Sequence, residues 1–473
     1  MDYTKTLEEL ALQALPSERQ LAWHEIGAYG FVHYGVNTYT GREWGDGTED
    51  PSIFAPTDLD PESWVLAFKD AELKGLVLTA KHHDGFCMWR TKTTKHSVAS
   101  SPYQGDVVGE TAEACRKHGL KFGVYLSPWD QNSPSYGTDE YNDFYLVQLR
   151  ELLSNYGEIF HVWFDGACGE GPNGKTQVYD FPAYIKLVRE LQPQATIFFD
   201  RGPDVRWVGN EAGQTRFQEW GAVPSELCDL HEDAMIDGGD PAYELHGIYN
   251  TDPGLGLLEM SLASRRLVYC PSEVDVSIRP GWFYHEDQEP KSPDVLFHLW
   301  ERSVGGNSCL NLNVPPMPSG RFDPKDIAAL KGLGERIRRA FALQVNDVQV
   351  EAVHTIGTIQ GELSLGTSQR AWRYEFTEKT PIAYIVLQED LTQGQRISSF
   401  EIEATGPFGK PQTIYHGTTV GFKKIVELNG YEAKDLKLIV RLSRGPAQLK
   451  TVKFYADRDE ETRQWVTGRT IMD

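Results

Sequence analysis

Residues 75–88 of the chain read Gly-Leu-Val-Leu-Thr-Ala-Lys-His-His-Asp-Gly-Phe-Cys-Met. The stretch begins as an apolar run typical of a buried strand and continues directly into two adjacent histidines and Asp84. In barrels built from parallel strands, polar side chains at the strand ends form the active site. His82, His83 and Asp84 could therefore bind a metal, transfer protons or hold the hydroxyls of a sugar. A polar turn around a satisfied histidine is the structural alternative.

Short apolar runs of the same kind recur through the first two-thirds of the chain. Together with residues 75–80 they make eight candidate strands, the others being 28–35, 121–127, 159–165, 195–200, 205–210, 267–270 and 309–314. The intervening segments have amphipathic spacing and plausible caps, as at 62–73, 109–118, 139–155 and 180–191. Eight strands with helical crossovers predict an α/β fold of the (β/α)8 barrel type.

The last part of the chain has a different pattern. After a final helical segment at 323–343, strand-like runs alternate with Gly, Pro and Asn, a pattern typical of an antiparallel β-sandwich. We therefore predict a (β/α)8-like catalytic domain at residues 1–344 and a β-sandwich domain at residues 345–473.

Composition excludes some classes of partner. The chain has 473 residues, 40% of them hydrophobic, which is enough to bury a large core in two or more domains. Its 68 acidic and 46 basic residues give a formal charge of −22, which repels nucleic acid and anionic membrane surfaces. We expect no nucleic-acid partner and no membrane partner, and the sequence carries no signal for an oligomeric state.

The cysteines and the amino-terminal residues bear on localisation. The six cysteines are scattered without the spacing of a zinc site, and the first residues have neither a basic opening nor an apolar core. No apolar run is long enough to cross a bilayer. We expect a bacterial-type cytoplasmic protein, or a secreted or periplasmic one if a signal peptide has been removed.

Residues 169–176, Gly-Glu-Gly-Pro-Asn-Gly-Lys-Thr, match the phosphate-loop pattern of nucleotide-binding proteins. Such a loop should enter a helix at its Lys-Thr pair, whereas the next predicted helix begins near Asp180. A surface loop is the better interpretation, and a phosphate-loop nucleotide-binding protein is an alternative.

Carboxylates follow several candidate strands. Asp165 ends the fourth, Glu211 follows the sixth, and Glu273 and Asp275 follow the seventh. Two carboxyl groups, one ionised and one protonated, are the minimum for cleaving a glycosidic bond. Aromatic side chains that would stack on sugar faces lie nearby in the sequence, namely Trp44, Trp163 and Trp282. The alternative is that some of these carboxylates only solvate the rim of the barrel.

Several motifs together carry a family resemblance. In chain order they are Phe31-Val-His33-Tyr-Gly, Glu43-Trp44, Lys81-His82-His83-Asp84-Gly-Phe, Val124-Tyr125-Leu-Ser127, Trp163-Phe-Asp165 and Asp200-Arg201. This ordered set, spread over residues 20–320, resembles the α-L-fucosidases of glycoside hydrolase family 29. Residues 206–211 and 278–285 resemble the branch of that family that prefers α-1,3- and α-1,4-linked fucose in branched, Lewis-type oligosaccharides.

The resemblance implies a retaining double displacement on fucosylated oligosaccharides, with neither metal nor cofactor. Asp165 matches the nucleophile. Glu211 is the first choice for the acid/base, and Glu273 is the second. Glu273 otherwise suits a contact with the sugar next to fucose. The residues implied in substrate binding are His33, Glu43, Trp44, His82, His83, Tyr125, Trp163, Arg201, Glu273 and Trp282.

A carbohydrate-binding protein that has lost catalysis is the other alternative. It would keep the aromatics and histidines but lose a carboxylate. Asp165, Glu211 and Glu273 are all present in this chain, which favours an enzyme.

Overall fold

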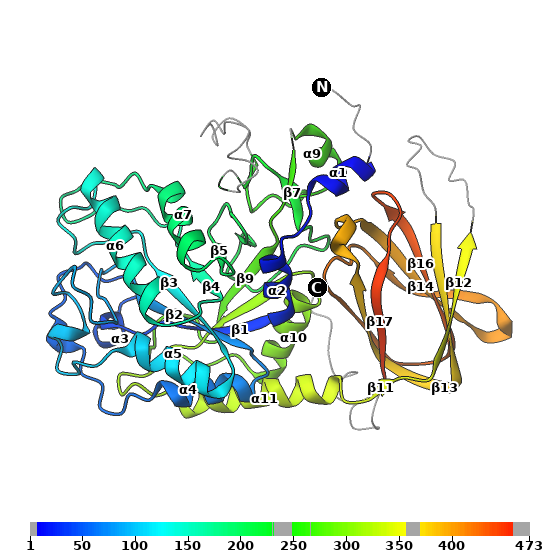
Figure 1. The fold of residues 1–473 in the computed structure, drawn as a ribbon. Coiled ribbons are helices and arrows are strands. Elements are labelled where there is room, and N and C mark those ends of the chain that lie inside the picture. Colours follow the sequence, from blue (N-terminus) through cyan, green and yellow to red (C-terminus); the bar gives the residue numbers. More distant parts are fainter. Residues whose placement is uncertain (1–6, 229, 231–247, 265, 356–368, 457–473) are drawn as a thin grey trace.

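The computed structural model describes residues 7–228, 230, 248–264, 266–355 and 369–456. Figure 1 shows two parts, a barrel with surrounding helices and an all-β part, with the long helix α11 (Pro324–Ala340) running from the first toward the second. The first part contains every candidate catalytic residue named above.

Eight parallel strands form the barrel sheet, in the spatial order β5-β4-β3-β2-β1-β10-β9-β6. A parallel bridge between Phe198 and Val205 brings the two edges together, so the barrel is nearly closed. The predicted fold class is confirmed. The strand bounds are β1 Ala28–Val32, β2 Gly75–Lys81, β3 Lys121–Leu126, β4 His161–Trp163, β5 Thr196–Phe198, β6 Arg206–Trp207, β9 Ser272–Ser277 and β10 Cys309–Asn313.

The predicted seventh strand is wrong. Residues 267–269 form β8, which pairs antiparallel with β7 (Ala222–Pro224) in a separate two-stranded sheet. The barrel strand is β9, which begins after Pro271 and pairs in parallel with β10 and β6. Every residue of β9 is buried although its sequence, Ser-Glu-Val-Asp-Val-Ser, alternates polar and apolar side chains. Glu273 and Asp275 therefore lie within a strand rather than after one.

Helices connect the barrel strands and cover them. Several begin with an aspartate whose side chain accepts a hydrogen bond from a backbone N–H of the first turn, as Asp60, Asp106 and Asp180 do. The helix bounds are α1 Leu7–Gln13, α2 Glu18–Ile26, α3 Val36–Thr40, α4 Pro61–Asp70, α5 Val107–His118, α6 Asp139–Asn155, α7 Phe181–Leu191, α9 Leu258–Ala263 and α10 Pro293–Val304.

The phosphate-loop motif lacks the helix that it needs. Residues 169–176 form a loop in which the backbone N–H of Gly171 donates a hydrogen bond to Lys175 O, and α7 begins only at Phe181. The acidic stretch His231–Asp240 lies outside the described residues.

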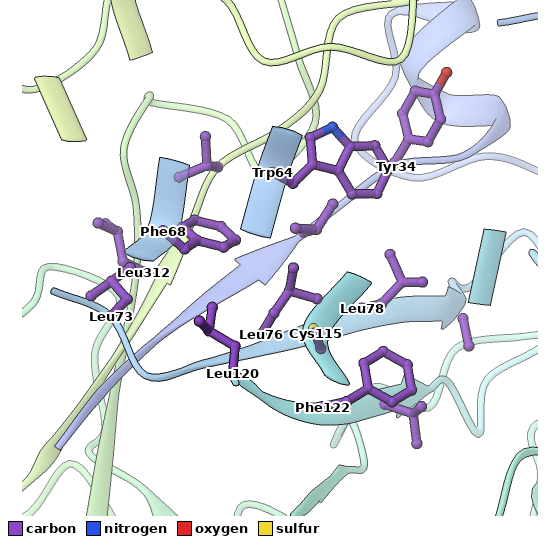
Figure 2. Close-up of a cluster of buried hydrophobic side chains, with 14 of the residues drawn as sticks. Tyr34, Trp64, Phe68, Leu73, Leu76, Leu78, Cys115, Leu120, Phe122 and Leu312 are labelled. Atoms are coloured by element: carbon purple, nitrogen blue, oxygen red, sulfur yellow. The ribbon is translucent and has the colours of Figure 1, made fainter. Parts of the chain in front are cut away.

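The barrel core lies between the strands and their covering helices. Figure 2 shows Trp64 and Phe68 of α4 above Leu76 and Leu78 of β2, and Phe122 of β3 beside Cys115, all in one cluster of buried side chains. All are nearly inaccessible to solvent. Burying such side chains contributes roughly 1.5–3 kcal/mol each, so this layer holds the strands in the register that brings their carboxyl ends together.

The carboxyl-terminal part is a seven-stranded antiparallel sheet with its own hydrophobic core. Its longest strand is β13, whose register with β16 shifts between Glu375 and Thr380. The bounds are β11 Gln344–Val345, β12 Val348–Thr355, β13 Gln369–Glu389, β14 Ile397–Thr405, β15 Pro411–Gly417, β16 Lys424–Ser443 and β17 Leu449–Ala456.

Hydrogen bonds join this sheet to the barrel part. Phe422 donates its backbone N–H to Asn307 Oδ1 at 2.7 Å, and the backbone N–H of Gly221 is donated to Gln395 Oε1 at 2.7 Å. All six cysteines are free thiols. Within the described ranges, no helix is both long and apolar enough to cross a membrane.

Candidate active site

Asp165 lies at the carboxyl end of β4, with both carboxylate oxygens engaged. The hydroxyl of Tyr125 donates to Oδ2 at 3.0 Å, and the backbone N–H of Ala167 donates to Oδ1 at 2.7 Å. His83 Nε2 lies 3.9 Å from Oδ2. The Asp165 side chain is nevertheless 24% exposed. An oriented carboxylate with an open face is suited to attack an electrophilic carbon.

The three histidines named from the sequence form one buried cluster beside Asp165. The ring centroids of His82 and His83 are 4.1 Å apart, and those of His33 and His82 are 5.6 Å apart. Burial lowers the pKa of His33 to about 3 and that of His82 well below its usual value. The pKa of His83 is also lowered, chiefly by burial. These imidazoles are therefore neutral near pH 7, each with one donor and one acceptor nitrogen.

Hydrogen bonds from neighbouring strand ends orient the cluster. His33 Nδ1 lies 2.8 Å from Asn313 Oδ1, and His83 Nδ1 lies 2.8 Å from Ser127 Oγ. Because Asn313 Oδ1 can only accept, His33 carries its proton on Nδ1, and its Nε2 is an acceptor. The arrangement can hold hydroxyl groups in a fixed orientation.

Asp84 is a structural member of this turn. Asn37 Nδ2 donates to its Oδ2 at 3.0 Å, and the backbone N–H of Phe86 donates to its Oδ1 at 2.7 Å. Burial is the main reason that the pKa of Asp84 is raised to about 7. Among the described residues, no group of three or more His, Cys, Asp or Glu side chains is arranged to hold a metal ion.

The predicted aromatic residues surround the histidines. Trp163 stacks on Phe198 with centroids 4.2 Å apart, and its ring lies 5.1 Å from that of Tyr125. The ring of Trp282 lies 5.2 Å from His33. Trp44 approaches His83 edge-on at 5.8 Å and is 61% exposed. The site therefore has a firmly packed aromatic floor and a largely exposed tryptophan at its edge.

Glu43 connects two loops at the edge of the site. Its Oε2 accepts a hydrogen bond from the backbone N–H of Trp282 at 2.8 Å, and its Oε1 lies 2.6 Å from His285 Nε2. The carboxylate of Glu43 therefore holds the loop after β9 against the loop after β1.

Glu273 lies deep inside the barrel. Its side chain is inaccessible to solvent, and its Oε1 accepts hydrogen bonds from Trp163 Nε1 at 2.9 Å and Asn311 Nδ2 at 3.0 Å. Oε2 accepts a hydrogen bond from the hydroxyl of Tyr29 and lies 3.0 Å from His161 Nε2. Glu273 thus holds the Trp163 ring in place from the interior of the barrel, through the hydrogen bond to Nε1.

Glu273 forms a coupled pair with Asp275 two residues along β9. Burial alone would raise the pKa of Glu273, but His161 and the surrounding hydrogen bonds lower it to about 2. Burial and the charge of Glu273 raise the pKa of Asp275 well above its usual value. The pair therefore carries one proton, on Asp275, and one negative charge, on Glu273.

Glu211 is exposed on the turn after β6. Asn210 shapes this turn, because its Oδ1 accepts a hydrogen bond from the backbone N–H of Ala212 at 3.1 Å and its Nδ2 donates to Gln214 O at 2.8 Å. Burial and the charge of Glu273 are the main causes of the raised pKa of Asp275, and the charge of Glu211 adds to them. No described residue makes a hydrogen bond with its carboxylate.

Asp200 belongs to the site, although its motif Asp200-Arg201 predicts a substrate contact only for Arg201. The Asp200 carboxylate packs against Gly166, next to Asp165. Burial and the charge of Asp165 raise the pKa of Asp200 to about 6, while Arg201 opposes the shift. The signal was present in the sequence, since Phe-Phe-Asp200 ends β5 as Trp-Phe-Asp165 ends β4.

Comparisons with known proteins identify the family of the chain. Residues 12–223 match the family model described as α-L-fucosidase. The chain is 37% identical to α-L-fucosidase 1 of Arabidopsis thaliana over 485 aligned residues, which cover 97% of this chain and 90% of the relative. It is 36% identical to a putative α-L-fucosidase 1 of Oryza sativa, with 95% and 86% covered.

Solved structures give the same result. A putative α-L-fucosidase from Bacteroides ovatus superposes with a TM-score of 0.86 at 41% identity, covering 96% of this chain and 77% of that one. A glycoside hydrolase family 29 fucosidase from Ruminococcus gnavus, in complex with fucose, has a TM-score of 0.79 at 26% identity, covering 95% and 96%. On this evidence, the chain belongs to the α-L-fucosidases of glycoside hydrolase family 29.

Proposed function

We propose that this α-L-fucosidase is a retaining enzyme whose nucleophile is Asp165. The observation that carries the proposal is the Asp165 carboxylate itself, held on both oxygens by Tyr125 and Ala167 yet still exposed at the end of β4. In the first step Asp165 attacks the anomeric carbon of fucose, and the bond to the leaving oxygen breaks. The product is a covalent fucosyl-enzyme and the free remainder of the glycan.

Glu211 is the proposed acid/base. It donates a proton to the leaving oxygen, and then takes a proton from the water that attacks the anomeric carbon and releases Asp165. Its exposed turn supports this role, because a group that serves a departing sugar and an entering water must reach solvent. Glu273 is less suited to it, since it is ionised, inaccessible and hydrogen-bonded to Trp163 and Asn311.

The fucose pocket is proposed to use the neutral histidines as hydrogen-bonding partners of the ring hydroxyls. A neutral imidazole both donates and accepts, so His33, His82 and His83 can each hold a hydroxyl without adding positive charge near the developing cation. The rings of Trp163 and Trp282 supply apolar contact for the sugar face and its methyl group. Arg201, on the loop after β5, is a further proposed polar contact.

The proposed substrates are fucosylated oligosaccharides with α-1,3- or α-1,4-linked fucose on a branched, Lewis-type core. Support comes from residues 206–211 and 278–285, and from Glu43, which anchors the second of these segments beside the pocket. Contacts with a second sugar of a branched substrate can draw the Glu211 turn into its catalytic position, so that binding energy away from the bond increases the rate.

A comparison of kcat/KM on three substrates tests this preference. We expect a Lewis-type trisaccharide to exceed 2′-fucosyllactose and an aryl fucoside by about tenfold or more, since a linear substrate lacks the second sugar. Equal or greater efficiency on the last two would overturn the linkage proposal and leave the α-L-fucosidase assignment intact.

A further inference from the structure

The carboxyl group of Asp200 lies beside the proposed nucleophile. Gly166 directly follows Asp165, and a Cβ built on Gly166 would lie 2.2 Å from Asp200 Oδ2 and 2.8 Å from its Cγ. This contact leaves no room for any side chain at position 166. The ends of β4 and β5, which are paired strands, thus bring two carboxyl groups together at the mouth of the barrel.

The carboxyl groups of Asp200 and Asp165 differ in their hydrogen bonding. Among the described residues, none donates a hydrogen bond to its carboxylate, although Asn250 Nδ2 donates to its backbone carbonyl. The charged groups that act on it are Asp165, which disfavours ionisation, and Arg201, which favours it. By contrast, Asp165 receives two hydrogen bonds.

Asp200 therefore lies beside a carboxylate that two hydrogen bonds hold in a fixed orientation. Burial and the charge of Asp165 raise the pKa of Asp200 to about 6. Below that pH Asp200 is mostly protonated, and above it Asp200 is mostly ionised.

We propose that Asp200 is a positioning residue that sets the negative charge around the nucleophile, and that its ionised form accelerates formation of the fucosyl-enzyme. The inference rests on the proposed role of Asp165. Positive charge develops on the sugar ring in the transition state, while the charge of Asp165 is consumed by the new bond. An ionised Asp200 supplies a second negative charge at a fixed position in a partly desolvated site, and the proton it has lost goes to solvent.

The test is the rate at which an activated 2-deoxy-2-fluoro-fucosyl donor labels the enzyme, measured against pH for the wild type and Asp200→Asn. Taking the ratio of the two rates cancels ionisations that both proteins share. At about pH 5, where Asp200 is mostly neutral, we expect the two proteins to be labelled at nearly the same rate. At about pH 7.5 we expect the wild type to be labelled about three- to tenfold faster than Asp200→Asn.

Asp180→Asn is the matched control. It makes the same chemical change at the exposed N-cap of α7, where asparagine can accept the same hydrogen bond from Ala183. The labelling rate of Asp180→Asn should stay close to that of the wild type at every pH. Thermal unfolding of Asp200→Asn should give a melting temperature at about pH 7.5 no lower than that of the wild type, because a buried charge has been removed.

Two results would overturn the inference. One is a ratio that does not change with pH, and the other is a uniform loss of labelling, as expected from a packing defect. Failure of the proposed function is distinguishable, because the wild type would then not be labelled at Asp165 at any pH.

Discussion

At the scale of single residues, the two glutamates named from the sequence have different environments, and substitution should separate them. Glu211→Ala should lower kcat/KM on a fucosylated oligosaccharide by about 10²- to 10⁴-fold, because the leaving oxygen then departs without a proton. The loss should be much smaller on an aryl fucoside with a good leaving group. Azide should restore turnover of that substrate, with fucosyl azide as the product detected by mass spectrometry.

The variant to compare with Glu211→Ala is Glu273→Gln. Glu273 is surrounded by Tyr29, His161, Trp163 and Asn311, so its replacement should lower the melting temperature and should not create azide rescue. If rescue occurs in the Glu273 variant and not in Glu211→Ala, the roles of the two glutamates must be exchanged.

At the scale of elements, β1 depends on a glycine for its contact with α4. A Cβ on Gly30 would lie 2.3 Å from the ring of Phe68, which is inaccessible to solvent and labelled in Figure 2. Gly30→Ala should therefore reduce the free energy of unfolding by about 1–3 kcal/mol in urea titrations. Gly254→Ala, where the nearest atom is 3.8 Å away, should change it by less than about 0.5 kcal/mol. Equal changes in the free energy of unfolding for the two variants would show that Gly30 and Phe68 are not tightly packed.

The strands that the sequence predicts are those in which an apolar run ends at a polar cluster, as in residues 75–84. The sequence does not predict β9, because this strand is not an apolar run. Its alternating Ser, Glu, Asp and Ser side chains are typical of a turn or an exposed strand, but here they are buried, and Glu273 and Asp275 belong to a buried polar cluster. Only the three-dimensional barrel brings Tyr29, His161 and Asn311 to them.

In the site, too, some features follow from local sequence patterns and others depend on the three-dimensional fold. Asp165 and the histidines are predictable because each follows an apolar run, where parallel strands present their chemistry. The surroundings of Asp200 are not, because its contact with Gly166 depends on the pairing of β4 with β5 rather than on any local pattern.

At the scale of the whole molecule, stability should depend on pH through buried carboxyls outside the site. Burial is the main reason that the pKa of Glu389, in the carboxyl-terminal sheet, is raised to about 7 from its ordinary value of 4.5. The folded protein thus holds a proton that the unfolded chain releases, and the stability from this group falls as pH rises from about 4.5 to 7. The shift corresponds to roughly 2–4 kcal/mol.

Glu389→Gln should therefore reduce the decline of melting temperature over that pH range. The control is Glu375→Gln, an exposed position on the same strand β13, which should leave the decline as it is in the wild type. A decline that is unchanged in Glu389→Gln would show that this group is ionised in the folded protein throughout the range.

The proposed mechanism passes through a covalent fucosyl-enzyme on Asp165. The most direct measurement is to inactivate the wild-type enzyme with a 2-deoxy-2-fluoro-fucosyl donor, digest it and locate the label by peptide mass spectrometry. We expect one 2-deoxy-2-fluoro-fucosyl group per chain, on Asp165, and no labelling of Asp165→Asn. Labelling on another carboxylate, or an active wild-type enzyme that never forms an adduct and releases fucose with inverted configuration, would contradict it.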